Sequence, residues 1–152
     1  MKAMDWMYKI VLLKNKRGEK MEIKGKKILV VEDNEINMEI LTEMLISLGL
    51  EMEGVYNGQE AVDRIANAKE GDFHVVLMDI HMPIMDGYEA TKIIRSRSVP
   101  LCNIPVLALT GDSFAEDKKQ AKEVGMNGFI AKPVSLDRLS EEICDVLSED
   151  ER

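Results

Sequence analysis

From residue 26 onward, short runs of consecutive apolar residues alternate with longer segments whose apolar residues recur every three or four positions. Three short runs, at 28–31, 75–78 and 106–109, are apolar at every position. Such runs are typical of strands that are buried on both faces of a parallel sheet. Two weaker runs, at 51–55 and 128–131, are shorter or carry polar positions. The pattern therefore predicts three central strands and two edge strands.

The segments between these runs have helical periodicity. Asn57, Asp86 and Ser113 each precede a glutamate by three residues, the spacing of a capping box, and Ser135 is a fourth candidate cap. The first helix is predicted to bury one apolar face, formed by Ile36, Ile40, Leu41, Met44, Leu45 and Leu48. Five strand–helix units in series predict an α/β fold: a doubly wound five-stranded parallel sheet with helices on both faces.

Residues 1–24 fall outside this alternation, and we expect an N-terminal extension or linker there. Segments 8–13 and 21–23 could pair as a hairpin around 14–18, or the first segment could be helical. The rest of the chain is expected to form one domain over 25–148, followed by a C-terminal tail at 149–152.

Composition and charge narrow the classes of function. The 152 residues are 45% hydrophobic and 32% charged, a normal globular balance, and the net charge of −8 disfavours direct binding of nucleic acid. No apolar run approaches the roughly 18 residues that span a membrane. Cys102 and Cys144 lack metal-ligand spacing and are expected to be free thiols. We therefore expect a soluble, cytoplasmic protein.

Polar residues follow four of the predicted strands. Glu32 and Asp33 follow the first strand, Asp79 the third, Thr110 the fourth and Lys132 the fifth. Ligands of open α/β sheets bind beyond the carboxyl ends of the strands, so these side chains are expected at one edge. Three neighbouring carboxylates shift their pKa values or recruit a cation. Because the donors are all oxygens, Mg²⁺ is favoured over zinc.

This set of groups suits an in-line phosphoryl transfer, in which positioning and electrostatics supply most of the catalysis. Asp79 is the best nucleophile, because it leaves the central buried strand and a carboxylate can form an aspartyl-phosphate. Glu32 and Asp33 would then hold the metal. Lys132 can pair with one phosphoryl oxygen, and the Thr110 hydroxyl can donate to another.

Four segments carry a resemblance to a known family: VVEDN at 30–34, MDIHMPIMDG at 78–87, ALT at 108–110 and AKP at 131–133. In this order and spacing they resemble the receiver domains of two-component response regulators, over about residues 26–147. The resemblance implies a flavodoxin-like sheet with strand order 2-1-3-4-5. Residues 32–37 look especially like receivers attached to hybrid histidine kinases.

The resemblance also implies a role for each site residue. Asp79 would accept a phosphoryl group from a phosphohistidine on a histidine kinase or a histidine phosphotransfer protein. Asp33, Asp79 and the backbone carbonyl of His81 would ligate Mg²⁺, while Glu32 would act through a metal-bound water. Thr110 and Phe129 would be the switch residues. Pro83, Gly87 and Pro133 would be structural, with a cis bond between Lys132 and Pro133.

The expected function is therefore a phosphorylation-dependent switch that catalyses its own phosphorylation and dephosphorylation and turns over no external substrate. The last two helices would form a surface for a partner or a homodimer, and no output domain is evident in the sequence. An aspartate-nucleophile phosphatase is disfavoured, because it would need a second acid where His81 stands. A flavin carrier is disfavoured, because Glu32 and Asp33 replace the phosphate cradle after the first strand.

Overall fold

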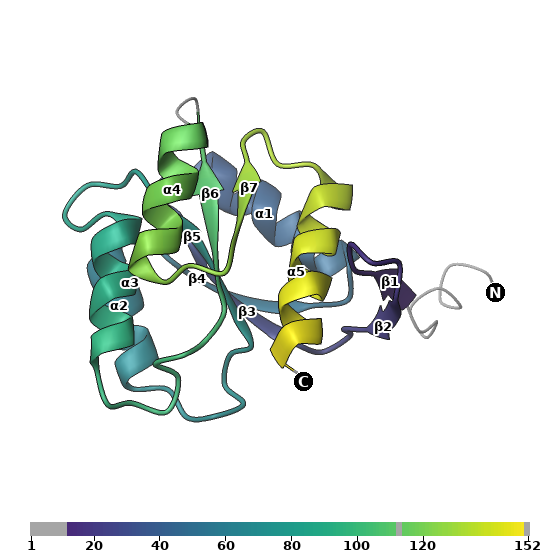
Figure 1. Ribbon diagram of the computed structural model, residues 1–152, viewed down its shortest axis with the longest axis horizontal. Coiled ribbons are helices and arrows are strands. Elements are labelled where there is room, and N and C mark those ends of the chain that lie inside the picture. Colours follow the sequence, from purple (N-terminus) through teal and green to yellow (C-terminus); the bar gives the residue numbers. More distant parts are fainter. Residues whose placement is uncertain (1–11, 112–113, 151–152) are drawn as a thin grey trace.

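The computed structural model describes residues 12–111 and 114–150 and contains a five-stranded parallel sheet (Figure 1). Its strands are β3 (Lys27–Val31), β4 (Glu51–Val55), β5 (Val75–Asp79), β6 (Val106–Thr110) and β7 (Gly128–Ala131). They lie in the order β4-β3-β5-β6-β7. Counted along the chain within this sheet, the order is 2-1-3-4-5, so the predicted topology is confirmed.

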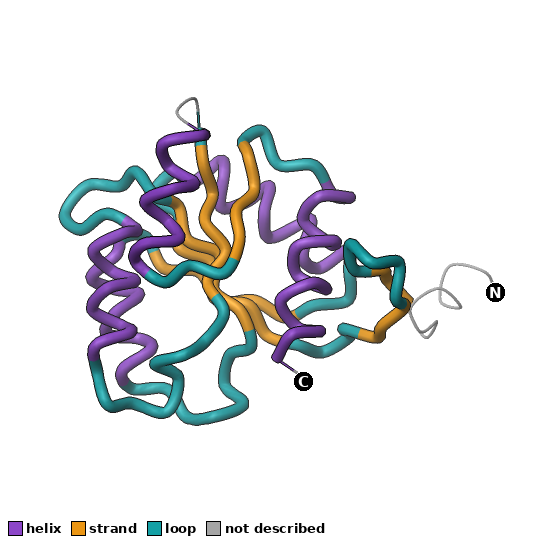
Figure 2. The backbone as a smooth tube through the Cα atoms, in the orientation of Figure 1, coloured by secondary structure: helices purple, strands orange, loops and turns teal. Residues whose placement is uncertain are grey.

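Five helices cover the two faces of the sheet (Figure 2). They are α1 (Glu35–Ser47), α2 (Gly58–Ala66), α3 (Gly87–Ser96), α4 (Phe114–Val124) and α5 (Leu136–Asp150). One core lies between the sheet and α2, α3 and α4, and contains Ile65, Ile94 and Ala121. The other lies between the sheet and α1 and α5, and contains Leu45 and Ile143. The doubly wound arrangement is therefore confirmed.

The central strand β5 is buried at all five positions, as its continuous apolar sequence predicts. β6 is buried throughout as well, whereas the edge strand β4 is exposed or half-buried along its length. The polar positions in the sequence of β4 therefore correctly distinguished this edge strand from the central strands β5 and β6. Asp79 ends the most protected strand of the sheet.

The predicted buried face of α1 is wrong at two positions. Ile36 and Ile40 are 67% and 46% exposed, and Met38 is buried instead. The reason is that α1 is apolar on several sides, so periodicity does not fix its rotation. The Met38 side chain packs so closely against Gly54 of β4 that a β-carbon at position 54 would lie 2.8 Å from Met38 Sδ. This close fit fixes the rotation of α1, and Ile40 therefore faces solvent.

Short polar contacts begin the helices. The side chains of Asn57 and Asp86 accept hydrogen bonds from the backbone N–H three residues later, and Ser135 caps α5 in the same way. These three predicted caps are confirmed, whereas Ser113 lies outside the described residues. Asn34, which the sequence reading did not identify, caps α1 by accepting from the N–H of Asn37 at 3.0 Å.

The N-terminal part of the described chain is an antiparallel hairpin of β1 (Leu12–Lys14) and β2 (Lys20–Glu22). The hairpin lies beside α5 (Figure 1). After β2, Ile23 is completely buried in the core with α1 and α5. Residues 8–11 of the first predicted segment lie outside the described residues; the described part pairs as a hairpin, one of the two alternatives. The domain boundaries at 24 and 148 stay predictions. No helix of the described chain has the length and apolar character needed to cross a membrane.

Candidate functional site

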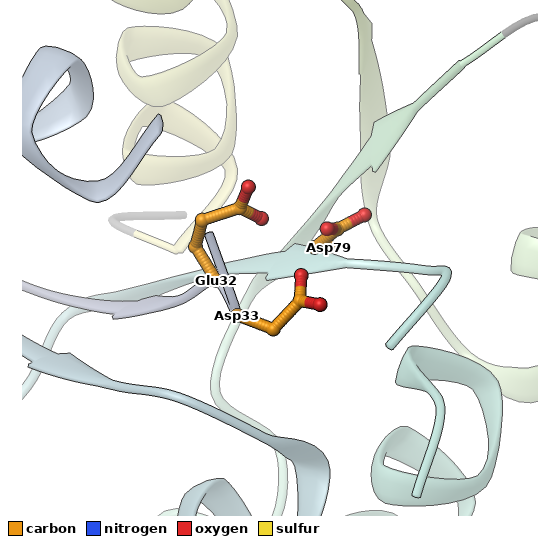
Figure 3. A group of neighbouring side chains, drawn as sticks. All are labelled: Glu32, Asp33 and Asp79. Carbon is orange, nitrogen blue, oxygen red and sulfur yellow. The ribbon is translucent and has the colours of Figure 1, made fainter. Parts of the chain in front are cut away.

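Three carboxylates converge at the carboxyl edge of the sheet (Figure 3). Glu32 and Asp33 follow β3, and Asp79 is the last residue of the neighbouring strand β5. One carboxylate oxygen from each residue lies within 4.8 Å of the other two. Glu32 and Asp79 are buried, whereas Asp33 is exposed to solvent. The three acids that the strand-end argument placed at one edge of the sheet are therefore neighbours in the structure.

Lys132 supplies the positive charge of the site. It follows β7, and its Nζ lies 3.1 Å from Asp79 Oδ2 and 3.7 Å from Glu32 Oε1. Thr110 ends β6, the strand between β5 and β7, and is fully buried. Its hydroxyl donates a long hydrogen bond, 3.5 Å, to the carbonyl oxygen of Ile130. The ends of β3, β5 and β7 therefore contribute side chains to one cluster, and Thr110 ends the strand that lies between β5 and β7.

Glu32 is in an unfavourable environment for a charged group. Oε1 accepts a 2.7 Å hydrogen bond from the Asn37 side chain, but Oε2 is buried without a hydrogen-bond partner among the described residues. Burial, reinforced by the neighbouring Asp79 carboxyl, raises the pKa of Glu32 to about 7. The sequence reading missed Asn37, because a contact from the first turn of a helix depends on how that helix is rotated.

The oxygen atoms of these three side chains are suitable ligands for a hard divalent cation. All of them are carboxylate oxygens, the buried Oε2 of Glu32 lacks a partner in the described structure, and Asp33 is accessible from solvent. Mg²⁺ prefers oxygen ligands and keeps several waters, which a site of two or three carboxylates allows. Glu32, Asp33 and Asp79 are therefore the residues that can hold it.

The loop between β5 and α3 leads away from Asp79 in a tight path. The N–H of His81 donates to Asp79 Oδ1 at 3.3 Å, while the His81 ring is largely exposed. Ile84 has a φ of 72°, and the N–H of Met85 donates to the carbonyl of Pro83 at 2.8 Å. These features define a strained γ-turn with a β-branched centre, which the sequence did not reveal.

Gly87 ends this loop at a position where a side chain does not fit. A β-carbon there would lie 2.5 Å from the backbone oxygen of Asp79. The first turn of α3 is thus seated directly on the end of β5, which agrees with the structural role expected of Gly87. On the opposite side of the site, the bond between Lys132 and Pro133 is cis, as expected.

Phe129 lies in β7 and is half-buried against the core on the α4 side of the sheet. The ammonium groups of Lys118 and Lys122, both on α4, lie 4.9 Å and 6.0 Å from the centre of its ring. Cation–π attraction therefore links the edge strand to α4. The switch role predicted for Phe129 and Thr110 stays a prediction.

A small apolar cavity of about 130 Å³ opens beside the carboxylates. It lies between α1 and the segment after β7, and Ile40, Lys132, Pro133 and Val134 line it. Lys132, which lines the cavity, also pairs with Asp79 and therefore joins the cavity to the acidic site. Exposed apolar surface next to a charged site is typical of a protein contact.

Comparison with known protein families identifies this arrangement. A family model described as the response regulator receiver domain matches residues 28–144. The chain belongs to this family. The matched region begins at β3 and ends within α5, so this receiver domain contains every site residue discussed above, and the β1–β2 hairpin precedes the match.

Curated proteins similar to this receiver domain include histidine kinases. The domain is 42% identical over 118 residues to the osmosensing histidine protein kinase SLN1 of Saccharomyces cerevisiae, covering 74% of this chain and 9% of that protein. The chain spans only 6–16% of the length of the curated relatives it matches first. These relatives are hybrid or sensor histidine kinases and a two-component system protein, with which a receiver role agrees.

Solved structures that are similar to this receiver domain include two with direct bearing on the site. The first is the receiver domain of sensor histidine kinase PA1611 from Pseudomonas aeruginosa, with magnesium in its active-site cleft (34% identity, TM-score 0.70, 78% of this chain and 94% of that one). The second is the receiver domain of Ssk1 from Saccharomyces cerevisiae in complex with the histidine phosphotransfer protein Ypd1 (34% identity, TM-score 0.67, 79% and 87%).

Proposed function

We propose that this receiver domain accepts a phosphoryl group on Asp79 from a phosphohistidine of a histidine kinase or a histidine phosphotransfer protein. The observation that carries the proposal is the position of Asp79, a buried carboxylate paired with Lys132 and set between two further acids. In the reaction, the bond from phosphorus to the histidine nitrogen breaks, and a bond from phosphorus to an Asp79 carboxylate oxygen forms.

Each neighbouring group has a task in this transfer. The Lys132 ammonium lies 3.1 Å from Asp79 and can form an ion pair with a phosphoryl oxygen once the phosphoryl group is bound there. Asp33, Asp79 and the backbone carbonyl of His81 would hold Mg²⁺, with Glu32 reaching it through a water. The bound Mg²⁺ supplies charge neutralisation between the acceptor carboxylate and the incoming phosphoryl group. The Thr110 hydroxyl would exchange its long bond to Ile130 for one to the phosphoryl group.

The surface beside the site favours a protein donor. Ile36 and Ile40 of α1 are exposed, and Ile40 lines the apolar cavity that adjoins Lys132. The complex of the similar Ssk1 receiver with Ypd1 supports a donor of the same class, a histidine phosphotransfer protein. We expect its apolar surface to cover α1 and bring the phosphohistidine to Asp79.

After phosphorylation, the added charge would bias Thr110, α4 and Phe129 toward a second arrangement. The surface of α4 and α5 would then be presented to a partner or a second copy of the chain. The hairpin contacts one side of α5, where Lys16 forms an ion pair with Glu142. A homodimer would therefore use a part of α5 that the hairpin leaves uncovered.

The direct test is intact-mass analysis after incubation with acetyl phosphate, with and without Mg²⁺. We expect a gain of about 80 Da, the mass of one phosphoryl group in an acyl phosphate, that requires both Mg²⁺ and Asp79. Asp79→Asn should abolish the adduct, and Asp63→Asn, an exposed position on α2, should not. An adduct of equal yield in Asp79→Asn, or none in the unaltered protein, would overturn the proposal.

A further inference from the structure

Asp117 is a buried carboxylate on α4, outside the acidic cluster of the site. Only 5% of the residue is exposed. The Tyr88 hydroxyl donates to Asp117 Oδ1 at 2.8 Å, and His81 Nε2 lies 3.3 Å from Oδ2. A buried carboxylate is costly unless hydrogen bonds compensate its lost hydration. These two partners therefore fix where the Asp117 side chain lies.

The two partners come from different segments. Tyr88 is in the first turn of α3, and His81 is in the loop between β5 and α3. Figure 1 shows α3 and α4 as neighbours on one face of the sheet. Burial and the Asp117 carboxylate raise the pKa of Tyr88, so its hydroxyl stays protonated and continues to donate. Asp117 thus joins α4, α3 and the loop that follows the phosphoacceptor.

His81 is the connection from this cluster to the site. Its backbone N–H donates to Asp79 Oδ1 at 3.3 Å. Its side chain is 65% exposed, so packing contributes little to holding the ring, and the contact with Asp117 is what orients it. Because a carboxylate oxygen can only accept, Nε2 carries the hydrogen in this contact. A continuous path of contacts therefore runs from Asp79 through His81 and Asp117 to Tyr88.

We propose that Asp117 is a positioning residue for the phosphoacceptor site: by holding the His81 ring, it fixes the loop whose backbone contacts Asp79 and joins that loop to α4. The inference rests on the proposed function, in which the His81 carbonyl is a ligand of Mg²⁺. With the ring released, this backbone would sample positions in which the carbonyl points away from the metal. Metal affinity and loop order should therefore depend on a residue that does not touch the metal.

The test is a double-mutant cycle on the full chain with Asp117→Ala, His81→Ala and both changes together. Calorimetric titration with Mg²⁺ alone gives the dissociation constant, and amide hydrogen exchange of residues 80–86 in metal-free protein gives the loop order. We expect Asp117→Ala to weaken Mg²⁺ binding about tenfold, the lower end of what partners that orient metal ligands contribute. Exchange in the loop should become faster.

Two further variants separate positioning from a general loss of stability. Asp117→Asn keeps one acceptor oxygen for His81 Nε2, and its amide can donate to the Tyr88 hydroxyl oxygen, so it should retain most of the Mg²⁺ affinity. Glu116→Ala, at an exposed position on the same turn of α4, should leave the affinity and the loop exchange unchanged. In the His81→Ala background, Asp117→Ala should have no further effect on Mg²⁺ binding.

Additive effects in the cycle, or unchanged Mg²⁺ affinity and loop exchange in Asp117→Ala, would overturn the positioning role. These outcomes are distinct from failure of the proposed function, which is measured by the phosphoryl adduct on Asp79. A chain that forms the adduct but shows an additive cycle would refute only the role of Asp117. A chain that forms no adduct but shows a non-additive cycle would refute only phosphoryl transfer.

Discussion

At the scale of single residues, Glu32 shows how the fold prepares a site for a cation. It is completely buried, and one of its oxygens lacks a hydrogen-bond partner among the residues described. Burial and the adjacent Asp79 carboxyl favour its neutral form and raise the pKa from 4.5 to about 7. A metal ion would favour the charged form instead. In the metal-free protein, the charge on Glu32 therefore opposes folding.

This predicts how the stability of the metal-free protein depends on pH. Below about pH 4.5, Glu32 is neutral in both the folded and the unfolded states; as the pH rises toward about 7, the unfolded state ionises first. This group therefore lowers the free energy of unfolding across that window, by on the order of 3 kcal/mol. Glu32→Gln should remove this decrease in urea denaturation with a chelator present.

Glu39→Gln, at an exposed position of α1, is the matched control and should keep the pH dependence of the unaltered protein. If Glu32→Gln and Glu39→Gln had the same pH profile, the carboxylate of Glu32 would not be the source of the effect.

The sequence predicted most of the site residues, because strand ends in a parallel sheet share one edge. Glu32, Asp33, Asp79 and Lys132 follow from that rule alone. Asn37 and Asp117 do not, because their contacts depend on the rotation of α1 and on the course of the loop after β5. The left-handed φ of Ile84 was hidden for a similar reason, since it is imposed by the turn and not by the residue type.

At the scale of elements, α1 separates what periodicity can predict from what it cannot. The position of the helix in the sequence was predicted, and so was its place between two strands of the sheet. Its rotation was not, because apolar residues lie on several sides and the fit of Met38 over Gly54 decides between them. The consequence is functional, because Ile36 and Ile40 face solvent near the proposed acceptor.

We predict that these two residues serve donor docking. The double change Ile36→Ser and Ile40→Ser should slow phosphoryl transfer from a phosphorylated histidine phosphotransfer protein about tenfold, because it removes apolar contacts at the centre of the interface. Phosphorylation by acetyl phosphate should stay the same, since that small donor needs no such surface. Rapid-quench measurement with each donor gives the two rates.

Ile46→Ser provides the control, because Ile46 is 61% exposed in the last turn of the same helix, far along α1 from the site. Equal slowing by this variant, or slowing with acetyl phosphate as well, would argue against a docking role for the first turns of α1.

At the scale of the whole molecule, the β1–β2 hairpin is joined to the domain although it precedes the family match. Asn15 in its turn is only 3% exposed; its Oδ1 accepts from the N–H groups of Arg17 and Glu19, and its Nδ2 donates to Ser148 on α5. Lys16 pairs with the buried Glu142 at 2.6 Å. Periodicity predicted a hairpin as one alternative, but it carried no information about docking on a helix more than a hundred residues away.

We expect Asn15→Ala to lower the free energy of unfolding by about 1–3 kcal/mol, because it removes the hydrogen bonds of a buried side chain that hold the turn and join it to α5. Chemical denaturation should still show one transition, since the hairpin and α5 would unfold together. Asn103→Ala, at an exposed position before β6, should change stability by less than about 0.5 kcal/mol. An unchanged midpoint in Asn15→Ala would mean that the hairpin contributes nothing to the stability of the domain.

The strand order also bears on how the chain assembles as it is synthesised. β4 pairs beside β3, β5 on the other side of β3, then β6 beside β5 and β7 beside β6. Each new strand therefore meets an edge that already exists, so the sheet can grow in the order in which the ribosome releases it. The acidic residues emerge first, and Lys132 emerges only after the last strand. A nascent chain would thus hold its three carboxylates together without their lysine until the final unit is added, and we expect that unit to complete folding.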